Sequence, residues 1–318
     1  MSRSGPVDHL ARADDALAAI GRTPLVRLNG LTEPDDAEIW VKIESANPTG
    51  SYKDRMALSM ILGAQRSGRL APQQPVVEYT GGSTGSSLAY VCSLTGHPLH
   101  IVSSDAFAVE KLRTMQALGA HVELVPSPEG ITPDLIPRMR ERAQQIARET
   151  GAYATDQFNN HDMVDGYVAL GEEIVGQLDG EVDAFCSYVG TAGCFLGTTR
   201  ALRAAVPGVH RVVVEPAESA VLSGQPAGTH HIEGGGIGFV PPQLSADDYD
   251  EVLPVPEAEA FAMARDAARR AGIFSGPSTG ANLVAARHLA RRLGAGHRVV
   301  TLQVDSGLKY LSGGLYEG

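Results

Sequence analysis

Cysteine, tryptophan and long apolar runs are all scarce in this sequence of 318 residues. The three cysteines, Cys92, Cys186 and Cys194, form no CxxC pair, so we expect no disulfide framework and favour a reducing, cytoplasmic location. No apolar run approaches the length of a membrane span. The N-terminal stretch MSRSGPVDHLARADD also lacks the apolar centre of a signal peptide, so neither export nor a membrane partner is expected.

Positive charge is scarce as well. The chain has 26 Lys and Arg against 37 Asp and Glu, a net charge of −11, and the two signs are mixed along the chain. This balance argues against nucleic acid as a partner, because nucleic-acid binding relies on clustered basic residues. A metal site is not expected either. His230 and His231 are adjacent and would point to opposite faces of a strand, and Glu233 adds no spaced third ligand.

Glycine, in contrast, is abundant, and its 36 copies suit an α/β enzyme with many tight strand-to-helix loops. Apolar segments typical of strands alternate with helical patterns almost throughout the chain. The predicted strands cover 41–44, 76–80, 99–104, 121–125, 183–189, 210–216 and 298–304. This alternation predicts βαβ units and a doubly wound α/β fold with parallel sheets. The length of the chain predicts two domains.

The segment VVEYTGGSTGSSLAYV (76–91) predicts a strand, a glycine-rich loop and a helix. Its glycines keep the loop thin, and its serine and threonine side chains line it with hydroxyls. Backbone N–H groups at a helix N-terminus attract anions, so the loop predicts an anion-binding site. The anion is either a cofactor phosphate or a group on a substrate.

A second glycine loop, GTAGC at 190–194, also lies between a predicted strand and a predicted helix. Its exposed N–H groups would suit the phosphate of a small cofactor. A dinucleotide site is the competing interpretation, with Glu215 after the next strand as the ribose-binding acid. However, Ala192 and Phe195 stand at glycine positions of the GxGxxG pattern, and no GK[ST] follows as in a P-loop. A packing turn without a ligand stays open.

The segment NPTGSYKDR (47–55) places Lys53 in the first turn of a predicted helix, with Ser51 as the N-cap and Asp54 completing a capping box. The helix dipole disfavours an ammonium at this end of the helix. The same field favours the neutral amine, which is the form that attacks a carbonyl carbon to make an imine. The alternative is an exposed lysine that pairs with Asp54 or Glu44.

Taken together, these segments resemble the cysteine synthase (O-acetylserine sulfhydrylase) family of pyridoxal-phosphate enzymes, which share a fold with the tryptophan synthase β subunit. The matching motifs follow the order of the family over nearly the whole chain. They are IGRTPLVRLNGL (20–31), NPTGSYKDR (47–55), EYTGGSTG (78–85), DQFNN (156–160), VGTAGC (189–194), HHIEGGGIGFVP (230–241), GIFSGPSTGAN (272–282) and DSGLKYLS (305–312).

The resemblance implies an α/β fold of two domains, each a mostly parallel sheet flanked by helices, as in type II pyridoxal-phosphate enzymes. A smaller, mobile domain at 47–152 would bind the substrate carboxylate. A larger domain, made of 12–46 and 153–318, would bind the cofactor phosphate. Homodimers are usual in the resembled family, so a homodimer is expected.

The resemblance also implies roles for single residues. Lys53 would carry the Schiff base to pyridoxal 5′-phosphate, and Ser278 would meet its pyridine nitrogen. The residues expected to contact the cofactor phosphate are Gly190, Thr191, Ala192, Gly193 and Cys194, while Ser83 would face the cofactor ring. The residues expected to bind substrate are Thr80, Gly81, Gly82, Ser83, Thr84, Gln157 and Gly235.

The implied activity is β-replacement on an O-activated L-serine, either O-acetylserine or O-phosphoserine. Loss of the leaving group would give an aminoacrylate, which sulfide or another nucleophile attacks to give cysteine or a related amino acid. Lys53 would act as the base. A neutral Ser278 hydroxyl at the ring nitrogen favours elimination and replacement over transamination.

Two loops depart from the family pattern. The usual Thr-Ser-Gly-Asn-Thr-Gly has Gly81 in place of serine and Ser83 in place of asparagine, and the phosphate loop has Ala192 and Cys194 where Gly and Thr are usual. Ser83 is shorter than asparagine and offers a hydroxyl in place of an amide, while a thiol is a weak hydrogen-bond donor. These changes leave the amino-acid donor open.

Extra space at Gly81 would admit a bulkier or differently charged leaving group, such as phosphate, or a different nucleophile. Arg55 and Arg113 are candidates for recognising an extra negative charge. The alternative is that each forms a surface or interdomain ion pair.

Three further hypotheses remain open. The first is a serine or threonine dehydratase, which eliminates without an added nucleophile. The second is a non-catalytic member that keeps the fold and the cofactor and serves as a regulatory partner. The third is a nicotinamide oxidoreductase that uses the loop at 190–194 and Glu215.

Overall fold

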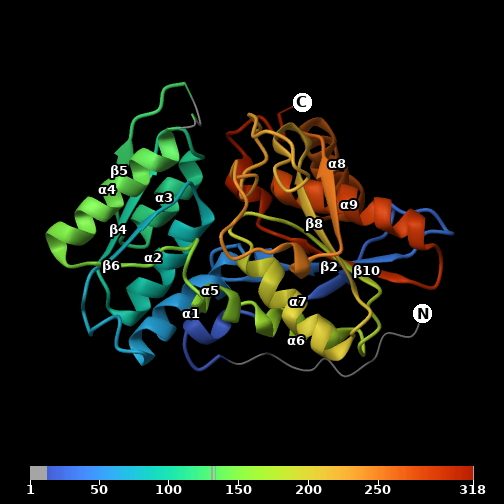
Figure 1. Ribbon diagram of the computed structural model, residues 1–318, viewed down its shortest axis with the longest axis horizontal. Coiled ribbons are helices and arrows are strands. Elements are labelled where there is room, and N and C mark those ends of the chain that lie inside the picture. Colours follow the sequence, from blue (N-terminus) through green and yellow to red (C-terminus); the bar gives the residue numbers. More distant parts are fainter. Residues whose placement is uncertain (1–12, 130–131, 133, 318) are drawn as a thin grey trace.

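The computed structural model describes residues 13–129, 132 and 134–317 (Figure 1). The strands form two sheets, one of six strands in the order β1-β2-β10-β7-β8-β9 and one of four in the order β5-β4-β3-β6. Every neighbouring pair runs parallel except β1 and β2. Arg12, at the expected start of the larger domain, lies outside the described residues. The α/β fold with two mostly parallel sheets flanked by helices is therefore confirmed.

The elements follow the predicted alternation. The six-stranded sheet contains β1 (Leu25–Arg27), β2 (Glu38–Ile43), β7 (Ala184–Tyr188), β8 (His210–Pro216), β9 (Glu251–Val255) and β10 (Arg298–Gln303). The four-stranded sheet contains β3 (Val76–Tyr79), β4 (Leu99–Ser104), β5 (His121–Val125) and β6 (Tyr153–Ala154). Each predicted strand coincides with an observed one. The short strands β1, β6 and β9 were not predicted, because two to five residues carry too little periodicity.

Helices connect most of these strands. They are α1 (Lys53–Arg66), α2 (Ser83–Thr95), α3 (Val109–Ala117), α4 (Leu135–Thr150), α5 (Asp162–Asp165), α6 (Val168–Gln177), α7 (Gly193–Ala205), α8 (Glu257–Ala271) and α9 (Pro277–Leu293). Short 3-10 helices cover Leu17–Ala19, Glu44–Ala46, Ala217–Ser219, Ala246–Asp248 and Gly307–Tyr310. In Figure 1 the green elements around the four-stranded sheet lie on the left, and those around the six-stranded sheet lie on the right.

One apolar core runs between the two sheets. It includes Met60 of α1, Ile101 of β4 and Phe185 of β7, each of which is fully buried. Helix α5 packs on both α1 and α7 between the sheets. Strand β8 is buried along nearly its whole length, as expected of a parallel strand covered on both faces. This shared core keeps the loops at the strand ends of both sheets in one region.

Gly171 and Gly176 of α6 form a matched pair for a stability test. A Cβ on Gly171 would clash with the Thr198 carbonyl oxygen and lie 2.8 Å from the Ala201 Cβ in α7, whereas nothing lies within 4 Å of a Cβ on Gly176. Gly171→Ala is expected to lower the free energy of unfolding by about 1–3 kcal/mol, because α6 and α7 must separate. Gly176→Ala is expected to raise it by up to about 1 kcal/mol through helix propensity. Urea unfolding measures both, and equal effects would contradict the close helix contact.

Candidate active site

Loops from both sheets meet at the carboxyl ends of their strands. Strand β2 leads toward α1, β3 leads into α2, and β7 leads into α7 through short loops. Strand β10 is followed by Asp305, which forms an isolated β-bridge with Ser51, two residues before Lys53. Open α/β sheets bind ligands at the carboxyl ends of their parallel strands. The predicted site residues thus lie where this fold places a ligand.

Lys53 is the first residue of α1 and is only 7% exposed. Its Nζ lies 4.9 Å from the centroid of the Tyr52 ring, and burial lowers its pKa to about 8. The alternative of an exposed, ion-paired lysine is wrong, since Lys53 is buried and forms no ion pair with the described residues. The predicted capping box is only half formed. Ser51 Oγ accepts a hydrogen bond from the Lys53 N–H at 3.3 Å, whereas the Asp54 carboxylate accepts one from the Thr49 N–H at 2.8 Å.

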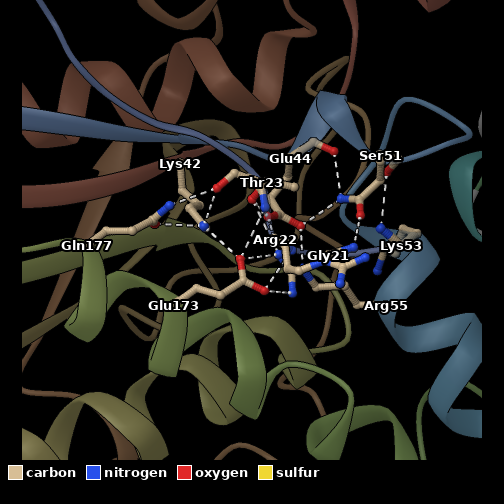
Figure 2. Close-up of polar contacts among 11 residues, drawn as sticks. Gly21, Arg22, Thr23, Lys42, Glu44, Ser51, Lys53, Arg55, Glu173 and Gln177 are labelled. Atoms are coloured by element: carbon tan, nitrogen blue, oxygen red, sulfur yellow. Dashed lines mark hydrogen bonds and ion pairs between the residues drawn. The ribbon is translucent and has the colours of Figure 1, made fainter. Parts of the chain in front are cut away.

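A buried ionic network adjoins Lys53 (Figure 2). Arg55 donates to Glu44 from Nε at 2.7 Å and to Glu173 of α6 from Nη1 at 2.7 Å. Lys42 pairs with the same Glu173 carboxylate at 2.7 Å. Burial alone would raise the pKa of Glu173, but the hydrogen bonds and charges of Arg55 and Lys42 hold it at about 2. Arg55 is therefore an internal ion-pair partner and is not available to recognise substrate charge, while Arg113 is exposed on α3.

The second glycine loop packs against the segment that contains Gly235. A Cβ on Gly190 would clash with the Gly234 carbonyl oxygen, and one on Gly235 would lie 2.8 Å from the Val189 carbonyl carbon. Gly193 begins α7, whose N-terminus has no side-chain cap, so its N–H groups are available to an anion. Cys194 is buried, which raises the pKa of its thiol and keeps it uncharged near the loop.

Thr191 and Ala192 are two other residues of the second glycine loop, at 190–194. The Thr191 hydroxyl is buried and lies 3.0 Å from the Met163 sulfur. Ala192 has φ of +70°, a left-handed conformation that glycine adopts at lower cost than alanine. The loop therefore keeps the backbone shape that a glycine would permit, in spite of the side chain.

Ser278 lies at the start of α9, where Pro277 occupies the first helical position. Ser278 is 1% exposed, and its Oγ has no hydrogen-bond partner among the residues that the structure describes. A Cβ on Gly234 would lie 3.9 Å from this Oγ. A buried hydroxyl without a partner costs free energy unless a ligand satisfies it. Ser278 thus lies beside Gly234, whose carbonyl oxygen also contacts Gly190 of the second glycine loop.

The first glycine loop contacts Gln157, a residue expected to bind the same substrate group. Thr84 Oγ1 donates to Gln157 Oε1 at 2.9 Å, and Thr80 Oγ1 accepts from the Gly82 N–H at 3.1 Å. Glu78, which was not among the predicted site residues, accepts a hydrogen bond from the Gln157 N–H at 3.1 Å. Burial raises the pKa of Glu78 to about 7. The sequence feature that could have indicated Glu78 is that it is the one acidic residue in the otherwise apolar strand VVEY.

The space beside Gly81 is filled by an aromatic ring. A Cβ on Gly81 would lie 2.6 Å from Cζ of Phe107, so the expected room for a bulkier leaving group at this position is wrong. Ser83 contacts the C-terminal segment. Its Oγ donates to Asp305 Oδ2 at 3.3 Å and accepts from Lys309 Nζ at 3.2 Å.

Glu215 does not face a ligand. Its carboxylate accepts hydrogen bonds from the Leu222 N–H at 2.8 Å and the Ser223 N–H at 3.0 Å, which anchor the segment after β8. His230 and His231 contact different partners, the Gly236 carbonyl and the Glu257 carboxylate. Across residues 13–129, 132 and 134–317 there is neither a cluster suited to a metal ion nor a helix able to span a membrane.

Comparisons with known proteins identify the family. The model of the family described as "Pyridoxal-phosphate dependent enzyme" matches residues 16–305. Cysteine synthase from Staphylococcus aureus is 35% identical over 98% of this chain and 97% of its own length. The crystal structure of O-acetylserine sulfhydrylase isoform 3 from Entamoeba histolytica has 34% identity and a TM-score of 0.91, covering 100% of this chain and 95% of that one. The O-acetylserine-dependent cystathionine β-synthase from Helicobacter pylori has 34% identity and a TM-score of 0.88, covering 96% of this chain and 100% of that one.

The chain belongs to the family of pyridoxal-phosphate-dependent enzymes. Within that family it is a cysteine synthase-like enzyme of the β-replacement type, so the predicted family and cofactor are confirmed. The local chemistry fits the cofactor. Lys53 offers a buried amine for its carbonyl carbon, the uncapped start of α7 offers N–H groups for its phosphate, and Ser278 offers an unpaired hydroxyl for its ring nitrogen.

Ala192→Gly is expected to stabilise the protein. The left-handed conformation of Ala192 costs more for alanine than for glycine, so the free energy of unfolding should rise by about 1 kcal/mol. Ala204→Gly is the control, because Ala204 is exposed within α7, the helix that Ala192 precedes, and it should lower the free energy of unfolding by up to about 1 kcal/mol. Thermal unfolding of the cofactor-free protein tests both, and a loss of stability in Ala192→Gly would contradict the strain.

Proposed function

We propose that this enzyme catalyses β-replacement on O-acetylserine or O-phosphoserine, with sulfide or another nucleophile, to form cysteine or a related amino acid. The observation that carries this proposal is the buried, unpaired and neutral hydroxyl of Ser278. Bound pyridoxal phosphate supplies an electron sink for the Cα–H bond electrons. A neutral hydroxyl at the ring nitrogen tempers that sink, which favours loss and replacement of the β-substituent over transamination.

The chain's own residues take the following roles. Lys53 would hold the cofactor and would accept the Cα proton of the substrate, a task suited to an amine with a pKa of about 8. The residues that would hold the cofactor phosphate are Gly190, Thr191, Ala192, Gly193 and Cys194, and Ser83 would face the ring. The residues that would hold the substrate carboxylate are Thr80, Gly81, Gly82, Ser83, Thr84 and Gln157, with Gly235 lining the cleft.

Two relatives of similar identity to this chain are named for different reactions, so they do not decide the nucleophile. The S. aureus relative is a cysteine synthase, whereas the H. pylori relative is a cystathionine β-synthase that depends on O-acetylserine. Both share about a third of their residues with this chain, at 35% and 34% identity. An activated serine donor is thus the better supported part of the proposal, and sulfide is the first nucleophile to test.

We further propose that the unit at 47–152 moves against 12–46 and 153–318 when substrate binds. The first glycine loop and Lys53 lie in the smaller unit, and Ser278 lies in the larger one. A substrate bound by both units would draw them together and exclude water. A cytoplasmic homodimer completes the proposal, supported by the absence of a CxxC pair and by the usual assembly of the family.

Parallel assays of the purified holoenzyme test the proposed activity. O-Acetylserine, O-phosphoserine and serine are each supplied with and without sulfide, and cysteine is measured by mass spectrometry. Cysteine from an O-activated serine is the expected result, and Lys53→Ala should abolish it. Formation of a 2-oxo acid from unmodified serine without sulfide would instead favour the dehydratase. No reaction of any donor by a cofactor-loaded protein would favour the non-catalytic partner.

Cofactor loading should depend on pH through Lys53. Only the neutral amine attacks the cofactor, and with a pKa of about 8 its fraction falls about tenfold for each pH unit below that value. The rate of cofactor incorporation into the apoenzyme should therefore rise with pH and level off above about pH 8. Growth of the cofactor absorption band measures this rate. A rate independent of pH between about pH 6 and about pH 9 would contradict the lowered pKa.

A further inference from the structure

Lys111 of α3 lies directly against the first glycine loop. Its side chain is only 4% exposed. A Cβ built on Gly82 would lie 2.8 Å from the Lys111 Cδ and 3.4 Å from its Nζ. Glycine at position 82 therefore leaves the room in which this ammonium approaches the loop.

The Lys111 ammonium also reaches segments on the opposite side of the site. It donates to the Tyr310 hydroxyl at 3.3 Å, lies 4.5 Å from the centroid of that ring, and pairs with the Glu233 carboxylate. The Tyr310 ring lies against Gly276, where a Cβ would be 2.6 Å from its Cζ, and Gly276 precedes Ser278 by two residues. The ammonium thus lies among the segments that carry the proposed substrate and cofactor contacts.

A second buried lysine, Lys309, donates to Ser83 at 3.2 Å, so two ammonium groups lie beside consecutive residues of the loop. The two nearby carboxylates differ in their freedom to move. Asp305 is 3% exposed and accepts a hydrogen bond from the Tyr310 hydroxyl at 2.8 Å. The Glu233 side chain is 26% exposed and is followed by three consecutive glycines. Glu233 is therefore the carboxylate that another anion can replace without leaving a charge buried and unpaired.

We propose that Lys111 selects amino-acid donors whose β-substituent is negatively charged, as in a phosphate monoester, and that Glu233 occupies the ammonium until such a donor replaces it. This inference rests on the proposed function and names the donor class for the same site. Neither arginine considered from the sequence serves this purpose. Arg55 is bound by Glu44 and Glu173, and Arg113 is exposed.

The role of Lys111 follows from the charge that develops in the reaction. As the Cα proton passes to Lys53, the electron pair of the Cα–H bond becomes available to form the Cα=Cβ bond. The Cβ–O bond breaks as this double bond forms, and its electron pair leaves with the phosphate oxygen. A buried ammonium close to that oxygen stabilises the growing negative charge.

Binding of two unreactive ligands tests this proposal without relying on turnover. The first is the phosphonate analogue of O-phosphoserine, in which a methylene replaces the ester oxygen, and the second is norvaline, its neutral counterpart. Isothermal titration of the holoenzyme gives both dissociation constants. Arg113→Met is the matched control for Lys111→Met, since it removes the same charge from an exposed position on the same helix.

Lys111→Met is expected to weaken binding of the phosphonate about tenfold or more and to change binding of norvaline less than about twofold. Arg113→Met should change neither, and Glu233→Gln should tighten phosphonate binding severalfold, because it removes the competing carboxylate. An equal loss for both ligands, or no preference for the phosphonate in the unmodified enzyme, would overturn the proposal. If Lys111→Met does not fold, the Glu233→Gln result decides, and unchanged phosphonate binding would count against it.

These outcomes are separate from those of the proposed function. Cysteine formation from O-acetylserine, which has a neutral leaving group, reports on β-replacement whatever Lys111 does. Loss of phosphonate selectivity with intact O-acetylserine turnover in the unmodified enzyme would refute only the donor class. Lys111-dependent selectivity without turnover of any donor would refute only the proposed function.

Discussion

The position of Lys53 depends on the buried ionic network around Arg55. The Arg55 and Glu44 side chains are 3% and 0% exposed, and Lys42 is fully buried. Charges at this depth stabilise a protein only as a complete set, because removing one partner leaves an unpaired charge and costs about 3–5 kcal/mol. The network joins the end of β2, the first turn of α1 and helix α6. Lys53 is therefore fixed from both sides of the shared core before any ligand binds.

Close backbone contacts fix the other half of the site. A Cβ on Gly190 or Gly235 would clash with a backbone carbonyl oxygen of the facing segment, and the positive φ of Gly234 would strain any other residue there. The segment around Gly234 has no regular secondary structure, and these contacts hold it against the phosphate loop and Ser278. The unpaired Ser278 hydroxyl lies beside this segment, 3.9 Å from where a Cβ on Gly234 would stand. Small residues here set the shape of the site, and only a few side chains supply its chemistry.

Local motifs made much of the fold and the site predictable. Lys53 and the two glycine loops each belong to a short pattern between a strand and a helix, and Ser278, in the first turn of α9 after helix α8, was indicated by the family motif GPSTGAN. Their partners were not predictable, because Arg55 and Glu173 are separated by 118 positions and Lys111 and Glu233 by 122. Nor could one sequence show that Phe107 occupies the space beside Gly81. A missing side chain indicates a cavity only when no neighbour fills it.

Gly81 and Gly82 are best understood together with the segment that faces them. Phe107 fills the space at Gly81, and Lys111, one helical turn further along the chain, fills the space at Gly82. The loop therefore presents its N–H groups and hydroxyls, while the segment before and within α3 contributes a ring and an ammonium. Backbone groups of this kind bind the carboxylate common to all amino acids and discriminate little between them. If the loop binds that carboxylate, selectivity between donors would come from side chains that reach past the loop, such as those of α3 and the C-terminal segment.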